Sequence, residues 1–181
     1  MLLAGIGVSL LTYVSYVSIE ASVYQRTARA ALVVMASEPA ASVPAPRQHG
    51  DVLGEIVNAR IGLRAVITEG TSDDVLRHAV GHVPGTAGPG DSGNSALAGH
   101  RDGLFRPLRH IEVGDILSVM VPGGQIDYQV EWTRVVRPDE VWVMGPATGR
   151  TLTLITCHPF SFIGAAPDRF IVRARERVLP T

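Results

Sequence analysis

An apolar run without charge opens the chain. Residues 1–19, MLLAGIGVSLLTYVSYVSI, contain no charged side chain, and the first one is Glu20. About 20 apolar residues are enough for a helix to cross the hydrocarbon core of a bilayer. A cleaved signal peptide is the competing interpretation, but its apolar region usually spans only about 7–15 residues and ends in a small-x-small cleavage site. The nearest such pattern, ARA at 28–30, lies well beyond the run. The pattern therefore favours an uncleaved transmembrane anchor over 1–19.

The following segment, residues 20–50, changes from alanine-rich to proline-rich. Residues 21–37 contain no proline, so a helix can continue through them. ASEPAASVPAPRQHG, at 36–50, predicts a stiff, extended linker, because proline restricts the chain and donates no backbone hydrogen bond. We therefore expect a stalk or linker over 20–50 and a folded domain over 51–181.

Within 51–181 the hydrophobic pattern is that of short strands. Runs rich in β-branched and aromatic residues occur at 61–68, 94–98, 116–121, 125–136, 151–156 and 170–174. The glycine-containing stretch PGG at 122–124 separates two of them and indicates a hairpin. Helical signals are confined to 75–79 and 104–111. Many short strands with few helices predict a mostly β domain, either a closed barrel or a sandwich.

Composition narrows the class of protein. The chain is 46% hydrophobic and 18% charged with a net charge of −1, which predicts a buried core and argues against a nucleic-acid partner. All 16 Lys and Arg residues are arginine. The single cysteine excludes an intramolecular disulfide and a cysteine-based zinc cage. His78 and His82 have the i, i+4 spacing of a helical metal site, but no third ligand is evident, so we expect no metal.

Three polar residues stand at the ends of predicted strands. Cys157 lies where a strand gives way to a proline-containing loop, although a lone cysteine is more often a small buried hydrophobe. His100 follows another strand, and Cys–His pairs are a common activated nucleophile. Arg169 opens the last strand. Taken singly, His100 is typical of a structural histidine and Arg169 of a surface ion pair.

Taken together, these residues resemble a known set. TLITC at 153–157, His100 within AGHRD at 98–102, and Arg169 downstream have the identity, order and spacing of the sortase signature. The flanking sequence at 85–117 also resembles sortases, and the resemblance covers roughly 54–175. It is closest to class D sortases or to the single-copy sortases of Gram-negative bacteria.

The resemblance implies a fold and a reaction. The fold is a sortase-like, closed eight-stranded β-barrel with a few short helices. The reaction is cysteine transpeptidation without a cofactor: Cys157 attacks a Thr–Gly or Thr–Ala bond, His100 moves the proton, and Arg169 holds the oxyanion. The implied partners are a secreted protein with a C-terminal LPxT-type sorting motif and an amine acceptor, either a cell-wall peptide or a pilin-type lysine.

It also implies substrate-binding residues. In sortases the motif lies in a groove walled by the loop before the cysteine strand, which corresponds here to 137–150. The candidate residues are Thr156, Ala98, Val141, Trp142 and Val143. Trp142 equally fits a place in the core.

The implied substrates lie outside the cytoplasmic membrane. We therefore expect a single-pass membrane protein with its catalytic domain outside, although Arg26 and Arg29 after the apolar run favour the opposite orientation. Two other functions stay open at this point. One is a thiol peptidase that mainly hydrolyses its substrate, and the other is a non-catalytic binding or assembly barrel. The presence of the cysteine, the histidine and the arginine argues against the second.

Overall fold

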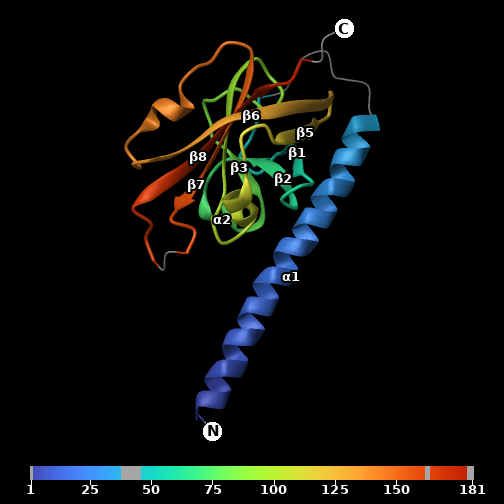
Figure 1. Cartoon of the computed structure of the whole chain (residues 1–181). Helices are drawn as coiled ribbons and strands as arrows, with labels where there is room; N and C mark the ends of the chain where they lie inside the picture. Colours follow the sequence, from blue (N-terminus) through green and yellow to red (C-terminus); the bar gives the residue numbers. More distant parts are fainter. Residues whose placement is uncertain (1, 38–45, 162–163, 179–181) are drawn as a thin grey trace.

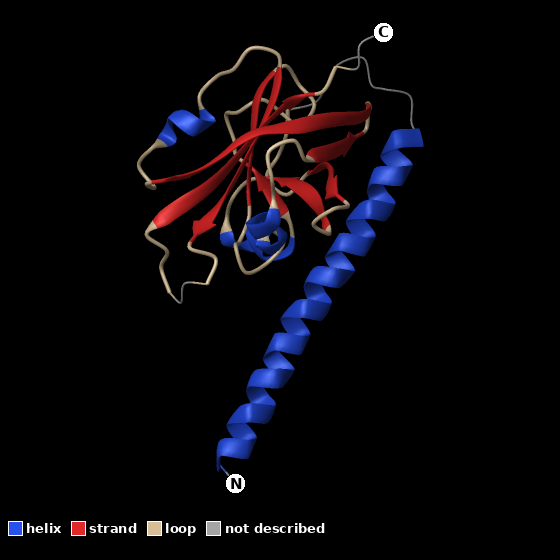
Figure 2. Ribbon diagram, in the orientation of Figure 1, coloured by secondary structure: helices blue, strands red, loops and turns tan. Residues whose placement is uncertain are grey.

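The computed structural model describes residues 2–37, 46–161 and 164–178. A long helix, α1 (Leu2–Ser37), precedes a barrel of strands (Figures 1 and 2). The strands of this described part are β1 (Val52–Asn58), β2 (Leu63–Glu69), β3 (Val80–His82), β4 (Gly93–Ala98), β5 (Ile116–Val121), β6 (Gly124–Val136), β7 (Arg150–His158) and β8 (Asp168–Glu176). The short helices are α2 (Asp73–His78), η1 (Arg106–His110) and η2 (Val141–Met144).

The strands close in the order β1-β2-β3-β4-β7-β8-β6-β5. All neighbours are antiparallel except β2 with β3 and β4 with β7. Parallel neighbours need a crossover, and the chain between β4 and β7 supplies one by building β5 and β6 on the other side of the barrel. The predicted mostly β, closed eight-stranded barrel is confirmed. Strands β1 and β3 were not predicted, because polar residues interrupt the first and the second has only three residues.

Alternation along the strands divides the side chains between two faces. On β7, Leu152 and Leu154 point into the main core, while Thr153 and Ile155 point outward. The main core fills the barrel with large side chains that include Ile56, Ile67, Leu97, Phe105, Leu117, Tyr128 and Val172. A second cluster, Val136, Val143 and Ile171, lies outside the barrel, where η2 covers the sheet.

Helix α1 packs along one side of the barrel through its second half (Figure 1). The Gln25 side-chain amide donates to the His78 carbonyl (2.8 Å) and accepts from the buried Val66 amide (2.9 Å). Arg29 pairs with Glu55, which also pairs with Arg64 (2.8 Å). The expected stalk is therefore helical as far as Ser37 and docked on β1, β2 and α2, while residues 38–45 lie outside the described residues.

Within the described part of the chain, no helix combines the length and the apolar character needed to span a membrane.

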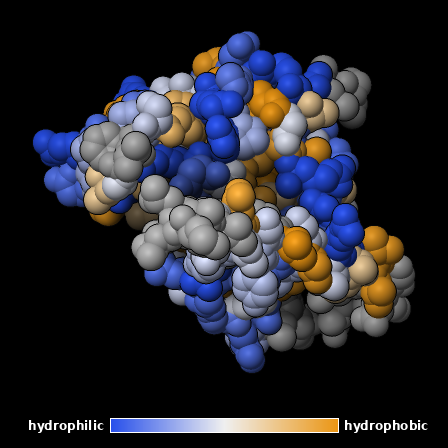
Figure 3. Space-filling model, turned by 90° about the horizontal axis from the view of Figure 1, so that it is seen from below, coloured by the Kyte–Doolittle hydropathy of each residue, from blue (hydrophilic) through white to orange (hydrophobic). Residues whose placement is uncertain are grey.

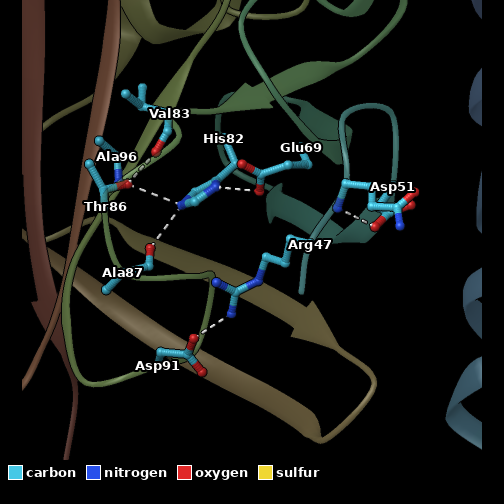
Figure 4. A network of polar contacts seen from close by, with 10 residues as sticks. Arg47, Asp51, Glu69, His82, Val83, Thr86, Ala87, Asp91 and Ala96 are labelled. Carbon is cyan, nitrogen blue, oxygen red and sulfur yellow. Dashed lines mark hydrogen bonds and ion pairs between the residues drawn. The ribbon is translucent and has the colours of Figure 1, made fainter. Parts of the chain in front are cut away.

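A buried histidine braces the strand that leads to His100 (Figure 4). His82 Nδ1 lies 2.7 Å from a Glu69 carboxylate oxygen, and Nε2 lies 2.9 Å from the Ala87 carbonyl oxygen. Thr86 Oγ1 donates to the Val83 carbonyl (2.7 Å), so it can only accept from His82. Both ring nitrogens thus lie within hydrogen-bond distance of oxygen atoms, and these contacts fix the orientation of the buried ring.

Candidate active site

Two neighbouring strands place the cysteine beside the arginine. Strands β7 and β8 are antiparallel, and Cys157 is directly opposite Arg169 in their register. Cys157 is a free, half-buried thiol at the end of β7. The Arg169 guanidinium is half-buried and donates to the Asp168 carbonyl (3.0 Å) and to that of Ala166 (3.4 Å). Both side chains leave the outer face of the barrel, so they point away from the hydrophobic core.

The histidine comes from the third strand of this face. Where β4 ends, the Gly99 amide donates to the Ile155 carbonyl (3.1 Å) and the Thr156 hydroxyl donates to the Gly99 carbonyl (2.7 Å). A Cβ on Gly99 would lie 2.7 Å from the Phe105 ring, so only glycine allows this packing. His100 follows immediately, exposed, with its carbonyl accepting from the Phe105 amide (3.2 Å).

One surface pocket holds all three predicted catalytic side chains. It has a volume of about 330 Å³ and is lined by His100, Arg101, Asp102, Cys157, Gly164, Ala165, Ala166 and Arg169. Residues separated by most of the domain in sequence therefore meet at the adjoining ends of β4, β7 and β8. A thiol, an imidazole and a guanidinium in one pocket provide a nucleophile, a proton carrier and a fixed positive charge.

The pocket includes residues that the sequence analysis missed. The Arg101 guanidinium donates to the Gly164 carbonyl (2.9 Å) and so ties the segment after His100 to the loop between β7 and β8. Its position next to the histidine in AGHRD was the available signal. No local sequence pattern predicts that Gly164 and its neighbours line the pocket, because the closed barrel brings this loop next to Cys157 and His100.

Helix η2 lies across the outer face beside the site. Its Val143 carbonyl accepts from Asn94 (3.1 Å) and from Arg173 (2.7 Å), and Asn94 also donates to the Gly145 carbonyl (2.9 Å). Thr153 completes the network by donating to the Asn94 side chain (2.6 Å). Strands β4, β7 and β8 thus fix η2 in place. Sequence reasoning missed Asn94, whose signal is an amide at the start of a short strand that is otherwise made of small and apolar residues.

The predicted substrate-binding residues differ in burial and in their neighbours. Ala98 is half-buried and pairs with Ile155 on the face that carries Cys157. Val143 is buried against the sheet, whereas Val141 and Trp142 are exposed on η2; none of the three lines the pocket with Cys157. The Thr156 hydroxyl is buried and bonded to Gly99, which gives it a positioning contact. Substrate contact by these residues stays a prediction.

Burial and local hydrogen bonds shift two pKa values around η2. Burial lowers the pKa of the Arg173 guanidinium, since desolvation disfavours its charged form. The pKa of Glu140 is lowered chiefly by the Arg137 backbone amide and then by the Trp142 indole, which both donate to its carboxylate. These contacts hold the start of η2 against the end of β6.

The remaining histidines do not build a second site. His158 stacks on Phe170 (ring centroids 6.3 Å apart) and meets the edge of Phe160, on the side of β7 opposite Cys157. His78 lies on α2 and His82 on β3, so they do not share a helix face. Among the described residues no three or more His, Cys, Asp or Glu side chains gather as metal ligands.

Comparison with known proteins agrees with this geometry. Residues 57–177 match the family model of the sortase domain. The chain is 34% identical over 130 residues to Sortase D of Bacillus subtilis strain 168, a match that covers 71% of this chain and 66% of that protein. Among solved structures, the Clostridium perfringens Sortase D5 transpeptidase is 30% identical, with a TM-score of 0.67 and coverage of 74% of this chain and 83% of that one. Sortase C1 of Streptococcus agalactiae is 32% identical, with a TM-score of 0.65 and coverage of 71% and 69%.

A closed β-barrel that brings Cys, His and Arg side chains to one pocket at adjoining strand ends provides a nucleophile, a proton carrier and a fixed positive charge together. The chain belongs to the sortase family. The family resemblance seen in the sequence is therefore confirmed.

Proposed function

We propose that this protein is a membrane-anchored cysteine transpeptidase that cleaves a C-terminal LPxT-type sorting motif and transfers the acyl part to an amine. The observation that carries the proposal is the single pocket lined by Cys157, His100 and Arg169. The relatives with sortase names support it. The chain spans 66% of the length of the Bacillus subtilis protein.

The first half of the reaction forms a thioester. The Cys157 thiol gives its proton to His100 and its sulfur attacks the threonine carbonyl of a Thr–Gly or Thr–Ala bond, and the resulting oxyanion lies against the Arg169 guanidinium. Arginine suits this place because it stays protonated at any working pH. The C–N bond then breaks, and the imidazolium of His100 gives its proton to the leaving amine.

The second half consumes the thioester. An acceptor amine attacks the acyl carbon, His100 takes the proton from the attacking nitrogen, and the Cys157 thiolate leaves. Water in place of the amine gives hydrolysis instead. The partition between amine and water separates a transpeptidase from a thiol peptidase, and only the acceptor's access to the pocket decides it.

Membrane attachment belongs to the same proposal. The segment through which we propose attachment is residues 1–19, which lack charge. Large apolar side chains are exposed at several described positions of α1, among them Leu11, Tyr13, Tyr16 and Ile19. In the view from below, hydrophobic residues (orange) are scattered among hydrophilic residues (blue) on the surface of the molecule (Figure 3). The catalytic barrel then lies outside the cytoplasm, where secreted substrates and their acceptors are found.

The decisive experiment follows the covalent intermediate. The full chain in mild detergent is mixed with peptides containing LPATG or LPATA, with and without triglycine as the amine, and products are followed by mass spectrometry. We expect an acyl adduct on Cys157 and an amine-dependent ligation product, both absent in Cys157→Ala. His100→Ala should lose most turnover, whereas the matched variant His110→Ala, in η1 and outside the pocket, should not. A folded protein that forms no adduct with any such peptide would refute the proposal.

A further inference from the structure

Beside the catalytic pocket, two arginines and two tryptophans form a patch on the outer face of the barrel. The tryptophan–arginine patch comprises Trp132 and Arg134 of β6, Trp142 of η2 and Arg173 of β8. The Arg134 guanidinium carbon lies 5.4 Å from the Trp132 ring centroid and 6.0 Å from that of Trp142. Arg173 lies 5.4 Å from the Trp132 ring as well, and the two indoles are 6.2 Å apart.

Neither arginine of this patch forms an ion pair with a carboxylate of the described residues, although Glu131 attracts Arg173 through its charge. Other arginines nearby form ion pairs, such as Arg137 with Asp139 (3.1 Å) and Arg175 with Glu131 (2.8 Å). Within the described residues, Arg134 and Arg173 contact aromatic rings but no carboxylate. Arg173 is the deeper of the two, because it bonds to the Val143 carbonyl and its Nε is buried without a partner. Arg134 is exposed and remains accessible to a ligand.

Strand register places Arg134 relative to the nucleophile. Cys157, Arg169 and Val136 form one row across β7, β8 and β6, and Ile155, Ile171 and Arg134 form the next row. Arg134 is thus two strands across and two residues along from Cys157. With strands about 4.8 Å apart and a rise of about 3.3 Å per residue, the Cα atoms are about 12 Å apart, which an extended peptide covers in three to four residues.

The chemistry fixes which end of the peptide points this way. His100 stands on the β4 side of Cys157 and protonates the leaving amine, so the C-terminal part of the substrate departs on that side. The acyl part then extends from Cys157 past Arg169 toward β6. Counting three to four residues back from the attacked threonine reaches the motif's leucine and the residue before it.

We propose that Arg134 is a specificity-determining residue that binds an acidic side chain immediately N-terminal to the leucine of the sorting motif. This inference rests on the proposed function. Stacking against Trp132 and Trp142 limits the rotamers of the long arginine side chain, so less entropy is lost when a carboxylate binds. Arg173 beneath it adds positive charge and bonds η2 in place through Val143. A planar guanidinium can pair with both carboxylate oxygens, which an ammonium cannot.

The test compares peptides that differ by one charge. The full chain in detergent is assayed with matched peptides carrying Glu or Gln directly before LPATA, and kcat/KM is measured for each. We expect the Glu peptide to be favoured about three- to fivefold, the size of a partly exposed ion pair, and the preference to shrink as salt rises. Moving the Glu to the x position should abolish the preference.

Variants then assign the effect to one residue. Arg134→Gln should bring the Glu/Gln ratio to about one, and Arg134→Lys should retain part of it. The matched control Arg77→Gln changes an exposed arginine of α2 and should leave the ratio and the turnover as they are. If the enzyme turns over both peptides equally, or if Arg134→Gln keeps the preference, this inference is wrong while the proposed function stands. If neither peptide is turned over, the proposed function itself fails.

Discussion

The role of Cys157 depends on which residues stand opposite it. A thiol at position 155 would lie under η2, as the Ile155 side chain does. A thiol at position 156 would face the barrel interior. Cys157 is the last residue of β7 that faces outward. There the strand register places it opposite Arg169, and the end of β4 brings His100 into the same pocket. The position of Cys157 along β7 therefore decides whether its thiol can share a pocket with His100 and Arg169.

Arg169 gives a first prediction at the residue scale. Arg169→Lys keeps the positive charge but removes the planar set of donors, so it should lower kcat by about 10²–10³-fold. Arg175→Lys, two positions beyond Arg173 on the same strand and paired with Glu131, is the matched control and should leave kcat near wild type. Steady-state kinetics together with thermal unfolding measure both effects. Equal losses in the two variants would contradict a specific role.

The threonines of β7 give a second prediction. Thr156→Val removes the donor to the Gly99 carbonyl, so the free energy of unfolding should fall by about 1–3 kcal/mol and kcat should fall as the segment before His100 loosens. Thr151→Val removes a buried hydroxyl that has no hydrogen-bond partner among the described residues, so it should be neutral or stabilising. Urea unfolding and kinetics on both variants check this. Similar losses of stability in both would show that the Gly99 contact contributes nothing special.

At the scale of elements, the strand that leads to His100 depends on its neighbour in the barrel. Strand β4 is braced from behind by β3, whose His82 is buried with Glu69 (Figure 4). A buried charge left without its partner is strongly destabilising, whereas removal of both charges is far less so. The pair is thus a scaffold contact, and its effect on catalysis runs through the placement of β4.

The Glu69–His82 pair is tested by a double-mutant cycle. His82→Leu should lower the free energy of unfolding by about 3–5 kcal/mol, because the Glu69 carboxylate is then buried unpaired. The double variant Glu69→Leu/His82→Leu should lose less than the sum of the two single losses. Chemical unfolding of all four proteins gives the coupling. Strict additivity would show that the two side chains do not interact.

Helix α1 is a second scaffold element, since it is docked rather than free. Gln25→Ala removes both the acceptor for the Val66 amide and the donor to the His78 carbonyl. Hydrogen exchange in 63–69 should therefore accelerate, and the free energy of unfolding should fall by about 1–3 kcal/mol. The matched control Gln48→Ala changes an exposed side chain and should leave exchange in 63–69 unchanged. Unchanged exchange in Gln25→Ala would mean that α1 does not hold this edge of β2.

At the scale of the whole molecule, one helix, α1, contains most of the uncharged segment 1–19 and also makes the contacts to the barrel. In Figure 1 the first half of the helix extends away from the barrel, while the second half lies along it. A docked helix transmits its direction to the domain, so attachment through 1–19 would also orient the catalytic pocket relative to the membrane.

Localisation is tested with fusions after Thr181. Alkaline phosphatase, which is active only outside the cytoplasm, should be active there, and green fluorescent protein should be dark. Deletion of residues 1–19 should move the protein from the membrane fraction to the soluble fraction, because the apolar segment is lost. A fusion that reports only a cytoplasmic location would overturn the proposed orientation.

The mostly β class was predictable because it depends on local patterns, whereas the choice of a closed barrel over a sandwich came from the family resemblance. Alternation and turn residues marked six of the strands, and the hairpin of β5 and β6 occurs with the predicted glycine-containing turn. The missed strands β1 and β3 carry polar or very few residues, so their strand conformation depends on neighbours. The register shift between Val130 and Trp132, which turns Trp132 to the outer face, was likewise invisible in the sequence.

Cys157, His100 and Arg169 could be proposed from the sequence alone, and so could the family, because these residues stand within motifs whose order and spacing are readable along the chain. Three features are visible only in the folded barrel: Arg101 and residues 164–166 complete the pocket, Thr156 bonds to Gly99, and Arg134 lies two strands from Cys157. Strand alternation is fixed locally, whereas the register between distant strands is fixed by packing of the closed barrel as a whole.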